Sequence, residues 1–327
     1  MEELLQIEPV VTSEVAIGPA TSSDNKFIHA NTEIISDHEL KSKCIIPVFS
    51  KDNESTISHP EFLESVLFAA QNYFKRESFL KPAVRVSHAV KGRVPSAIGK
   101  PVNQLSENEK TIYFERIAFV AEVPSIRDTV NGNDLSLTIG GVRAYNLDNL
   151  NGRKTEEHFK VFIGFKNKVC CNLCVWTDGF KAELKARSVN EIVQEAYSLF
   201  ASFRPELQLD AMTGFGDHYL TEKQFAQLVG RSRLYQFLPV KAKKEIPEAI
   251  PLMDSQISTV AKDYYSDKSF CRNVDGNIDL WKLYNLFTGA NKSSYIDTFL
   301  DRSVDASCFV KGLQNALKSG SEHWFLS

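Results

Sequence analysis

The stretch His158–Trp176, HFKVFIGFKNKVCCNLCVW, predicts two β-strands joined by a tight turn. Apolar residues alternate with other residues on both sides of the polar centre, which is typical of a hairpin that buries one face. A three-residue loop centred on Asn167 would pair Phe165 with Val169, and Asn167 or Lys168 would adopt the left-handed conformation that such loops need. We therefore expect an antiparallel hairpin with one apolar face.

The opposite face of this hairpin would bring aromatic, imidazole and ammonium groups together. Its side chains would be those of His158, Lys160, Phe162, Asn172, Cys174 and Trp176. Rings beside cations are typical of surfaces that stack unpaired nucleic-acid bases. The alternative is a sheet covered on both faces, in which Phe162 and Trp176 pack against a helix.

Strand-like segments fill the middle of the chain. Residues 83–90, 112–123 and 135–145 have the composition of strands, and Asn131-Gly132 predicts a turn before the third of them. Together with the hairpin, these segments predict an antiparallel sheet of about five strands, which is an ordinary size.

The second half of the chain has a helical pattern. Helix-start signals recur there at Ser188, Thr221, Asp254, Asn277, Ser294 and Ser303. One run of strands followed by one run of helices indicates an α+β fold. We therefore predict that class, with the antiparallel sheet in the middle of the chain and a mostly helical C-terminal half.

Three regions are expected along the chain. Residues 1–28 are rich in Glu, Ser, Thr, Pro and Asp and predict a mobile acidic tail. Residues 29–187 would form the α+β sheet domain, in which the capping box Ser58-x-x-Glu61 starts a helix. Residues 188–327 would form a helical region that packs on or beside the sheet.

Charge is distributed unevenly along the chain. The net charge of −3 combines −8 over residues 1–64, +6 over residues 65–168 and a nearly neutral remainder. A basic segment made mostly of strands indicates a polyanionic partner, although solvated surface lysines would give the same balance. Phosphate contacts are expected from Arg116, Arg143, Arg153, Lys154, Lys160, Lys166 and Lys168.

The helical half contains a second, smaller candidate for anion binding. It comprises Arg231 and Arg233 of one expected helix, with Asn291 and Lys292 of a polar break between two others. Free backbone amides at the start of the following helix would help to hold an anion. The alternative is an ordinary helix–turn–helix loop and arginines that contact their own helix.

No motif indicates catalysis, a metal or a cofactor. The chain lacks the P-loop, HExxH and GxSxG patterns. Cys171 and Cys174 would point to opposite faces of a strand, so they predict no zinc site. A hydrolase or nuclease would require distant carboxylates, such as Asp275, Asp297 and Asp301, to converge. We therefore favour a protein without enzymatic activity.

Nothing in the chain indicates a membrane protein. No apolar run approaches the ~20 residues that cross a bilayer. The first residues, MEELLQIEPVV, lack a basic leader followed by an apolar core. We therefore expect a cytoplasmic protein that has no membrane partner.

Several segments resemble one family when they are taken together: CIIPVFSKDNE, YFERIAFVAEVPSI, LTIGGVRAYN, LVGRSRLYQ and FCRNVDGNIDLWKLYNLFTGANKSSYIDTFLDRS. Over nearly its whole length, the chain resembles an uncharacterised family, labelled as a domain of unknown function, that is encoded on bacterial conjugative and phage- or plasmid-like elements. It is more distantly similar to the phage/plasmid-like protein family, through Arg231 and Arg233 in one helix and Trp281, Asn285 and Thr288 in a later one. The resemblance implies a mobile-element protein and carries over no catalytic residue.

Two functions follow as expectations. The first is a non-enzymatic mobile-element protein that binds nucleic acid, with single-stranded DNA favoured, in recombination or element maintenance. The order of helix, antiparallel strands and helix is similar to that of single-strand annealing proteins, which is an analogy of architecture alone. The second is a protein-interaction module that acts on a host or element factor through the acidic residues 1–28.

Overall fold

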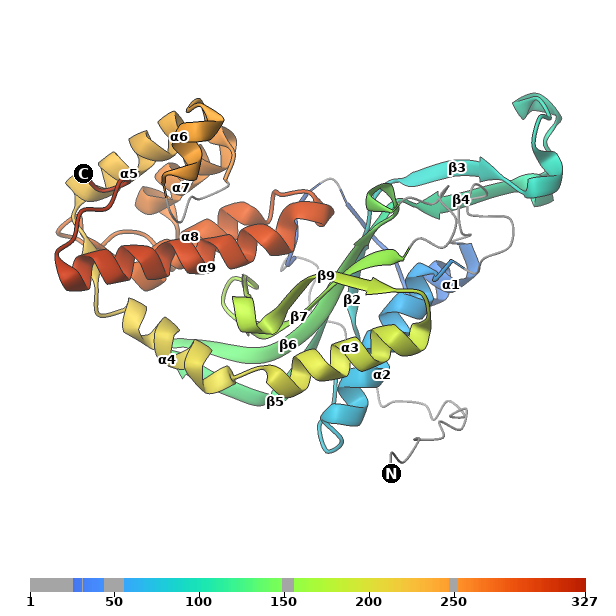
Figure 1. Ribbon diagram of the computed structural model, residues 1–327, viewed down its shortest axis with the longest axis horizontal. Coiled ribbons are helices and arrows are strands. Elements are labelled where there is room, and N and C mark those ends of the chain that lie inside the picture. Colours follow the sequence, from blue (N-terminus) through green and yellow to red (C-terminus); the bar gives the residue numbers. More distant parts are fainter. Residues whose placement is uncertain (1–25, 31, 44–55, 149–155, 247–251) are drawn as a thin grey trace.

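The computed structural model describes residues 26–30, 32–43, 56–148, 156–246 and 252–327. Within these ranges the chain has the predicted α+β class, with a curled antiparallel sheet in the middle and a helical C-terminal half (Figure 1). Most of the expected tail, residues 1–25, lies outside the described residues.

The central sheet contains seven strands, with the order β1-β2-β5-β6-β7-β8 and with β9 also paired to β7. These strands are β1 (Glu33–Ile34), β2 (Ala83–Val86), β5 (Arg116–Val130), β6 (Asn133–Ala144), β7 (Glu157–Asn167), β8 (Leu173–Cys174) and β9 (Phe180–Ala186). The expected number was about five, because the two-residue β1 and the charged β9 have no clear strand pattern. The turn between β5 and β6 lies at the predicted Asn131-Gly132, and both residues have positive φ angles.

The described helices are α1 (Asp37–Lys43), α2 (His59–Tyr73), α3 (Val189–Ser202), α4 (Pro205–Phe215), α5 (Glu222–Tyr235), α6 (Val240–Lys244), α7 (Asp254–Ser266), α8 (Leu280–Asn291) and α9 (Ile296–Ser319). The helices expected from Ser294 and from Ser303 are one continuous helix, α9. The cap expected at Asn277 is wrong, because Asp279 accepts a hydrogen bond from the N–H of Lys282 and caps α8. A short ladder between β10 (Tyr219–Leu220) and β11 (Ile278–Asp279) delays the start of that helix.

The hairpin of β7 and β8 is present, but its register differs from the expected one. Phe165 pairs with Cys174 instead of Val169, so the connection is longer than three residues. Asn167 closes this wider loop from inside, because its N–H donates to the carbonyl of Asn172 at 3.0 Å. Cys171, with a φ of 57°, takes the left-handed conformation that was expected at the turn.

Helices α2 and α3 cover one face of the sheet (Figure 1). Helix α2 begins at the predicted capping box, in which Ser58 and Glu61 each accept the other's backbone N–H. The ring centroid of Phe62 lies 4.8 Å from that of Phe159 on β7. A Cβ atom at Gly141 would lie 2.6 Å from the ring of Phe62, so the helix can approach the sheet this closely only over a glycine.

Helix α9 covers the opposite face together with Phe27 and Ile28. Phe162 of β7 packs there in one apolar cluster with Phe299 and Leu300 of α9. The ring of Phe27 lies 6.3 Å from that of Phe299, and Ile28 is completely buried. The sheet is therefore covered on both faces. The prediction of a mobile tail over residues 1–28 is therefore wrong for its last residues, since Phe27 and Ile28 belong to the core.

A two-stranded arm projects from the body of the protein (Figure 1). It consists of β3 (Ala89–Arg93) and β4 (Lys110–Phe114), which pair with each other but not with the central sheet. Three 3₁₀ turns, η1 (Pro95–Ala97), η2 (Val102–Gln104) and η3 (Glu107–Glu109), form its tip.

The arm divides each of two segments that were expected to be single strands. Residues 83–90 contribute β2 to the central sheet and the start of β3 to the arm, while residues 112–123 contribute the end of β4 and the start of β5. The division is held by reciprocal bonds: the N–H of Ser87 donates to the carbonyl of Arg116 at 3.0 Å, and the N–H of Arg116 donates to Ser87 Oγ at 3.1 Å. The chain exchanges pairing partners at this point.

Candidate functional site

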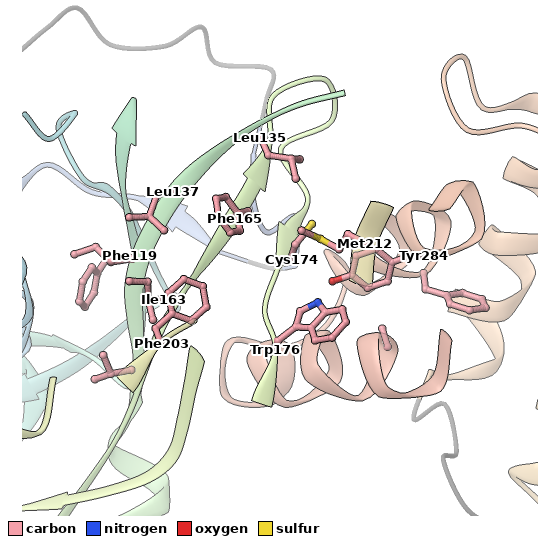
Figure 2. Packing of buried hydrophobic residues seen from close by; sticks show 14 of the residues in the cluster. Phe119, Leu135, Leu137, Ile163, Phe165, Cys174, Trp176, Phe203, Met212 and Tyr284 are labelled. Atoms are coloured by element: carbon pink, nitrogen blue, oxygen red, sulfur yellow. The ribbon is translucent and has the colours of Figure 1, made fainter. Parts of the chain in front are cut away.

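The two rings expected on an open stacking face are buried. Phe162 is 1% exposed and Trp176 is 8% exposed. The ring of Trp176 stacks on Phe215 of α4, with centroids 6.1 Å apart, and Figure 2 shows it facing Tyr284 of α8. The prediction that these rings are available to nucleic-acid bases is wrong, because α4, α8 and α9 cover the hairpin.

Most cations of the covered hairpin are paired with carboxylates. Lys160 contacts Asp301 of α9, and its Nζ also donates to the carbonyl of Asp297 at 2.7 Å. Lys166 lies 3.0 Å from Glu122, which also lies 3.9 Å from the more exposed Lys168. A phosphate would have to displace these carboxylates, so the expected role of the lysines in phosphate binding stays a prediction.

Two further predicted cations, Arg116 and Arg143, also have internal partners. Arg116 lies 3.1 Å from Glu115 and 3.7 Å from Asp297. Arg143 is buried and contacts Glu157, and it lies 3.6 Å from Asp148. The other two predicted cations, Arg153 and Lys154, lie outside the described residues.

Arg143 and His158 share a small pocket at the end of the sheet. The pocket has a volume of about 240 Å³ and is also lined by Lys160. The N–H of His158 donates to a carboxylate oxygen of Asp148 at 2.8 Å, and its Nδ1 lies 3.3 Å from the same oxygen. Three predicted site residues therefore meet here, but each of them contacts a carboxylate.

A buried histidine lies next to this cluster. His59 stacks on Tyr145, and its Nε2 lies 2.8 Å from the carbonyl oxygen of Phe114. Burial, and to a smaller extent the charge of Arg143, lower the pKa of His59 to about 3. His59 is therefore neutral near pH 7 and can donate its Nε2–H to that carbonyl.

The four residues of the smaller anion site also have partners within the protein. Asn291 donates to Ser303 Oγ at 2.9 Å, and Lys292 contacts the carbonyl of Cys170. Arg231 donates to the carbonyl of Ser327 at 2.6 Å, while Arg233 holds both carboxylate oxygens of Asp254, at 2.6 and 2.9 Å. Asn291 and Lys292 are buried between α8 and α9, so this segment fits the alternative of a helix–turn–helix connection better than an open anion site.

The buried thiols and the phenol near Trp176 are not activated for chemistry. Burial raises the pKa of Cys170 to about 11, and it also raises the pKa values of Cys174 and Tyr284 above their ordinary values. The carboxylates considered for a hydrolase are also engaged. Asp297 and Asp301 contact basic residues of the sheet, while Asp275 accepts hydrogen bonds from Asn277. Among the described residues, no group of three or more His, Cys, Asp or Glu side chains could hold a metal ion.

The arm presents its cations differently. Arg93 pairs with Lys110 and Lys91 pairs with Ile112 across the two strands, so the three cations share one face. Lys110 pairs with Glu107, at the tip. Neither Lys91 nor Arg93 has a carboxylate partner among the residues that the structure describes.

A cleft of about 730 Å³ runs along this face of the arm. Its lining includes Lys91 and Arg93 from β3, with Val102 and Leu105 from the tip. Arg93 donates to the carbonyl of Lys100, which keeps the tip close to the strands, and no carboxylate of the described part of the chain compensates its guanidinium charge. The arm therefore combines a concave surface with free positive charge.

Lys91 and Arg93 were not among the predicted site residues. Pro95, Gly99 and Pro101 interrupt any strand pattern between them and β4, and Gly99 has a φ of 90°. An insertion of this kind between two strand-like segments, with cations on both sides, is the signal from which the arm could have been found.

A family model described as "Domain of unknown function, B. Theta Gene description (DUF3871)" matches residues 7–326. The chain belongs to this family. The match includes both the covered hairpin and the arm. No curated protein and no solved structure matches the chain. Within the described ranges, no helix has the length and apolar character needed to cross a membrane.

Proposed function

We propose that this protein binds nucleic acid without catalysing a reaction, and that the arm of β3 and β4 is its contact element. The observation that supports this most is the pair Lys91 and Arg93, which lie on one face of a projecting ribbon and have no carboxylate partner among the described residues. Phosphate binding releases counterions from the nucleic acid and is favoured by such cations. A two-stranded ribbon also has dimensions that a DNA groove can admit.

The arm is a better candidate for contact with nucleic acid than the hairpin, for a physical reason. The hairpin cations Lys160 and Lys166 are neutralised by Asp301 and Glu122, whereas no described carboxylate pairs with the cations of β3. The preference for single strands depended on Phe162 and Trp176, and it loses its support because both rings are buried.

We further propose a setting for this activity. The resemblance of the chain to proteins of conjugative, phage- and plasmid-like elements supports a role in the recombination or maintenance of a mobile element. Such DNA is handled in the bacterial cytoplasm, where we place the protein.

Binding of fluorescently labelled 30-nucleotide single strands and 30-base-pair duplexes, followed by anisotropy at several salt concentrations, tests the proposal. The double variant Lys91→Glu/Arg93→Glu should weaken binding by at least about tenfold and reduce the salt dependence. The matched control is Lys223→Glu/Lys268→Glu, which changes charge equally at two exposed lysines of the helical half. Absence of salt-sensitive binding at micromolar protein, or equal losses in both variants, would reject the proposal.

The alternative remains a partner-binding module that acts on a host or element factor. The balance of −8 over residues 1–64 favours it, because this segment would repel nucleic acid. Deletion of residues 1–25 spares the buried Phe27 and Ile28. Loss of partner capture in this deletion, with an unchanged melting temperature and no nucleic-acid binding by the full chain, would favour the alternative.

A further inference from the structure

The tip of the arm exposes two aliphatic side chains. Ile98 is 68% exposed and Val102 is 71% exposed, and they lie on either side of a turn at Gly99. Removal of their apolar surface from water would be favourable. Because they lie at the end of a projection, beyond the core, another molecule could bury them.

The tip is ordered by contacts of its own. Lys100 pairs with Glu109, and Ser106 and Glu109 form a capping box across η3. The N–H of Lys100 also donates to the carbonyl of Ala97 at 3.1 Å, and Ala97 is completely buried. Because the tip is held in this way, Ile98 and Val102 can be inserted into a ligand at a small cost in conformational entropy.

We infer that the tip is a wedge that enters the minor groove of duplex DNA. Ile98 and Val102 would open a base step there, and the cations of β3 would lie on the other side of that step. The inference rests on the proposed function and names its ligand as bendable duplex DNA. Proteins that bend DNA from the minor groove combine Arg and Lys with inserted aliphatic side chains. The arm has this combination, since Lys91, Arg93 and the tip residue Val102 line the same cleft.

The charges and dimensions of the arm favour duplex DNA over an acidic protein or a second copy of the chain. Strands of five residues extend about 17 Å, which is on the order of half a helical turn of DNA. The two acidic side chains of η3, Glu107 and Glu109, are already paired with Lys110 and Lys100, so they do not oppose a polyanion. A second copy would bring the same positive face against itself.

The test uses a 30-base-pair duplex that carries a donor and an acceptor dye at its ends. The full-length protein should raise energy transfer on binding, because a kinked duplex brings the dyes together. Ile98→Ala/Val102→Ala should lower affinity for this duplex by about tenfold and abolish the rise in energy transfer. The same variant should bind within about threefold of the parent when the duplex contains a two-nucleotide gap, since the gap is already open.

The matched control is Ile34→Ala/Val274→Ala, which removes the same atoms from two exposed side chains that do not belong to the arm. It should bind and bend the duplex as the parent does. All variants are compared by melting temperature and by sedimentation, so that a change in folding or in self-association is seen directly.

The outcomes separate this inference from the proposed function. Duplex binding without a change in energy transfer, or tighter binding to single strands than to duplex, would overturn the wedge but leave nucleic-acid binding in place. A tip variant that alters the oligomeric state and not the affinity for DNA would assign the tip to self-association and would also overturn the wedge. Absence of binding to any nucleic acid would overturn both proposals.

Discussion

The covered hairpin of β7 and β8 and the projecting arm of β3 and β4 are both antiparallel ribbons that carry cations and apolar side chains. In the hairpin, Lys160 contacts Asp301 and Phe162 is buried under α9. In the arm, Arg93 has no carboxylate partner within the ranges that the structure describes, and Val102 is exposed. Similar local patterns thus lie in opposite surroundings. The hairpin is buried because helices cover it, whereas the described helices leave the arm exposed.

The charges show why the two ribbons differ in this way. A cation that loses water when a helix packs over it must be compensated, and α9 supplies Asp297 and Asp301 at the positions where Arg116 and Lys160 meet it. A cation on a projecting ribbon keeps its water and needs no partner. Uncompensated cations are therefore a better guide to a phosphate-binding surface than the number of cations in a strand.

The largest effect is expected from a substitution in the covered hairpin of β7 and β8. Phe162→Ala should lower the free energy of unfolding by about 3–5 kcal/mol, because the ring is completely surrounded and its removal leaves a cavity under α9. Urea denaturation measures this change. The matched truncation in the arm, Val102→Ala, should change the value by less than about 0.5 kcal/mol. Equal effects at the two sites would mean that the hairpin is not covered as described.

The next effect tests the compensation of buried charge. Glu157→Gln should destabilise the protein by about 2–3 kcal/mol, because Arg143 would keep only the more distant Asp148 as a carboxylate partner. Denaturant unfolding at pH 7 gives the value. In the arm, Glu107→Gln should have no measurable effect, since its partner Lys110 is exposed to water. A neutral result for Glu157→Gln would show that the carboxylate is not needed beside Arg143.

A pH-dependent effect is expected from the core beside the hairpin. The pKa of His59 is about 3 in the folded protein and 6.5 in an exposed chain, so between these values the unfolded state binds one more proton. The contribution of His59 to the free energy of unfolding is thus complete above pH 6.5. It decreases as the pH falls, by about 2 kcal/mol between pH 7 and pH 5. Unfolding free energies at the two pH values, compared with those of His59→Gln, isolate this contribution. A decrease of equal size in the variant would exclude His59 as its source.

The smallest global effect should come from the tip of the arm. The pKa of Glu109 is lowered to about 2, first by its bond with Lys100 and then by the capping contacts of Ser106. Lys100→Ala should leave the melting temperature unchanged, because Lys100 is exposed and the pair lies at the tip, away from the core. Hydrogen exchange should become faster at residues 94–109 alone. Faster exchange across the central sheet would show that the arm is coupled to the core.

Local signals predicted the parts of the fold that depend on neighbouring residues. The capping box of Ser58 and Glu61 and the turn at Asn131-Gly132 lie where the sequence places them. The start of α8 was misplaced, because a cap at Asn277 is as good locally as one at Asp279. The pairing of β10 with β11, residues about 60 positions apart, decides between them.

Local sequence signals were also insufficient to predict the candidate site. Alternation from Phe159 to Phe165 correctly placed these residues on one apolar face, but it contained no information about the layer above Phe162. The division of strands at Ser87 and Arg116 depends on bonds across 29 positions, so the arm could not be seen from either segment alone.

The chain by itself determined the class of fold, the helix starts that have capping boxes and the apolar face of the hairpin. These features result from backbone preferences and side-chain periodicity within about one turn or one strand. Only the tertiary structure decided which ribbon is covered and which projects. That choice depends on where Ile296–Ser319 packs, a contact that buries apolar surface between residues more than a hundred positions apart.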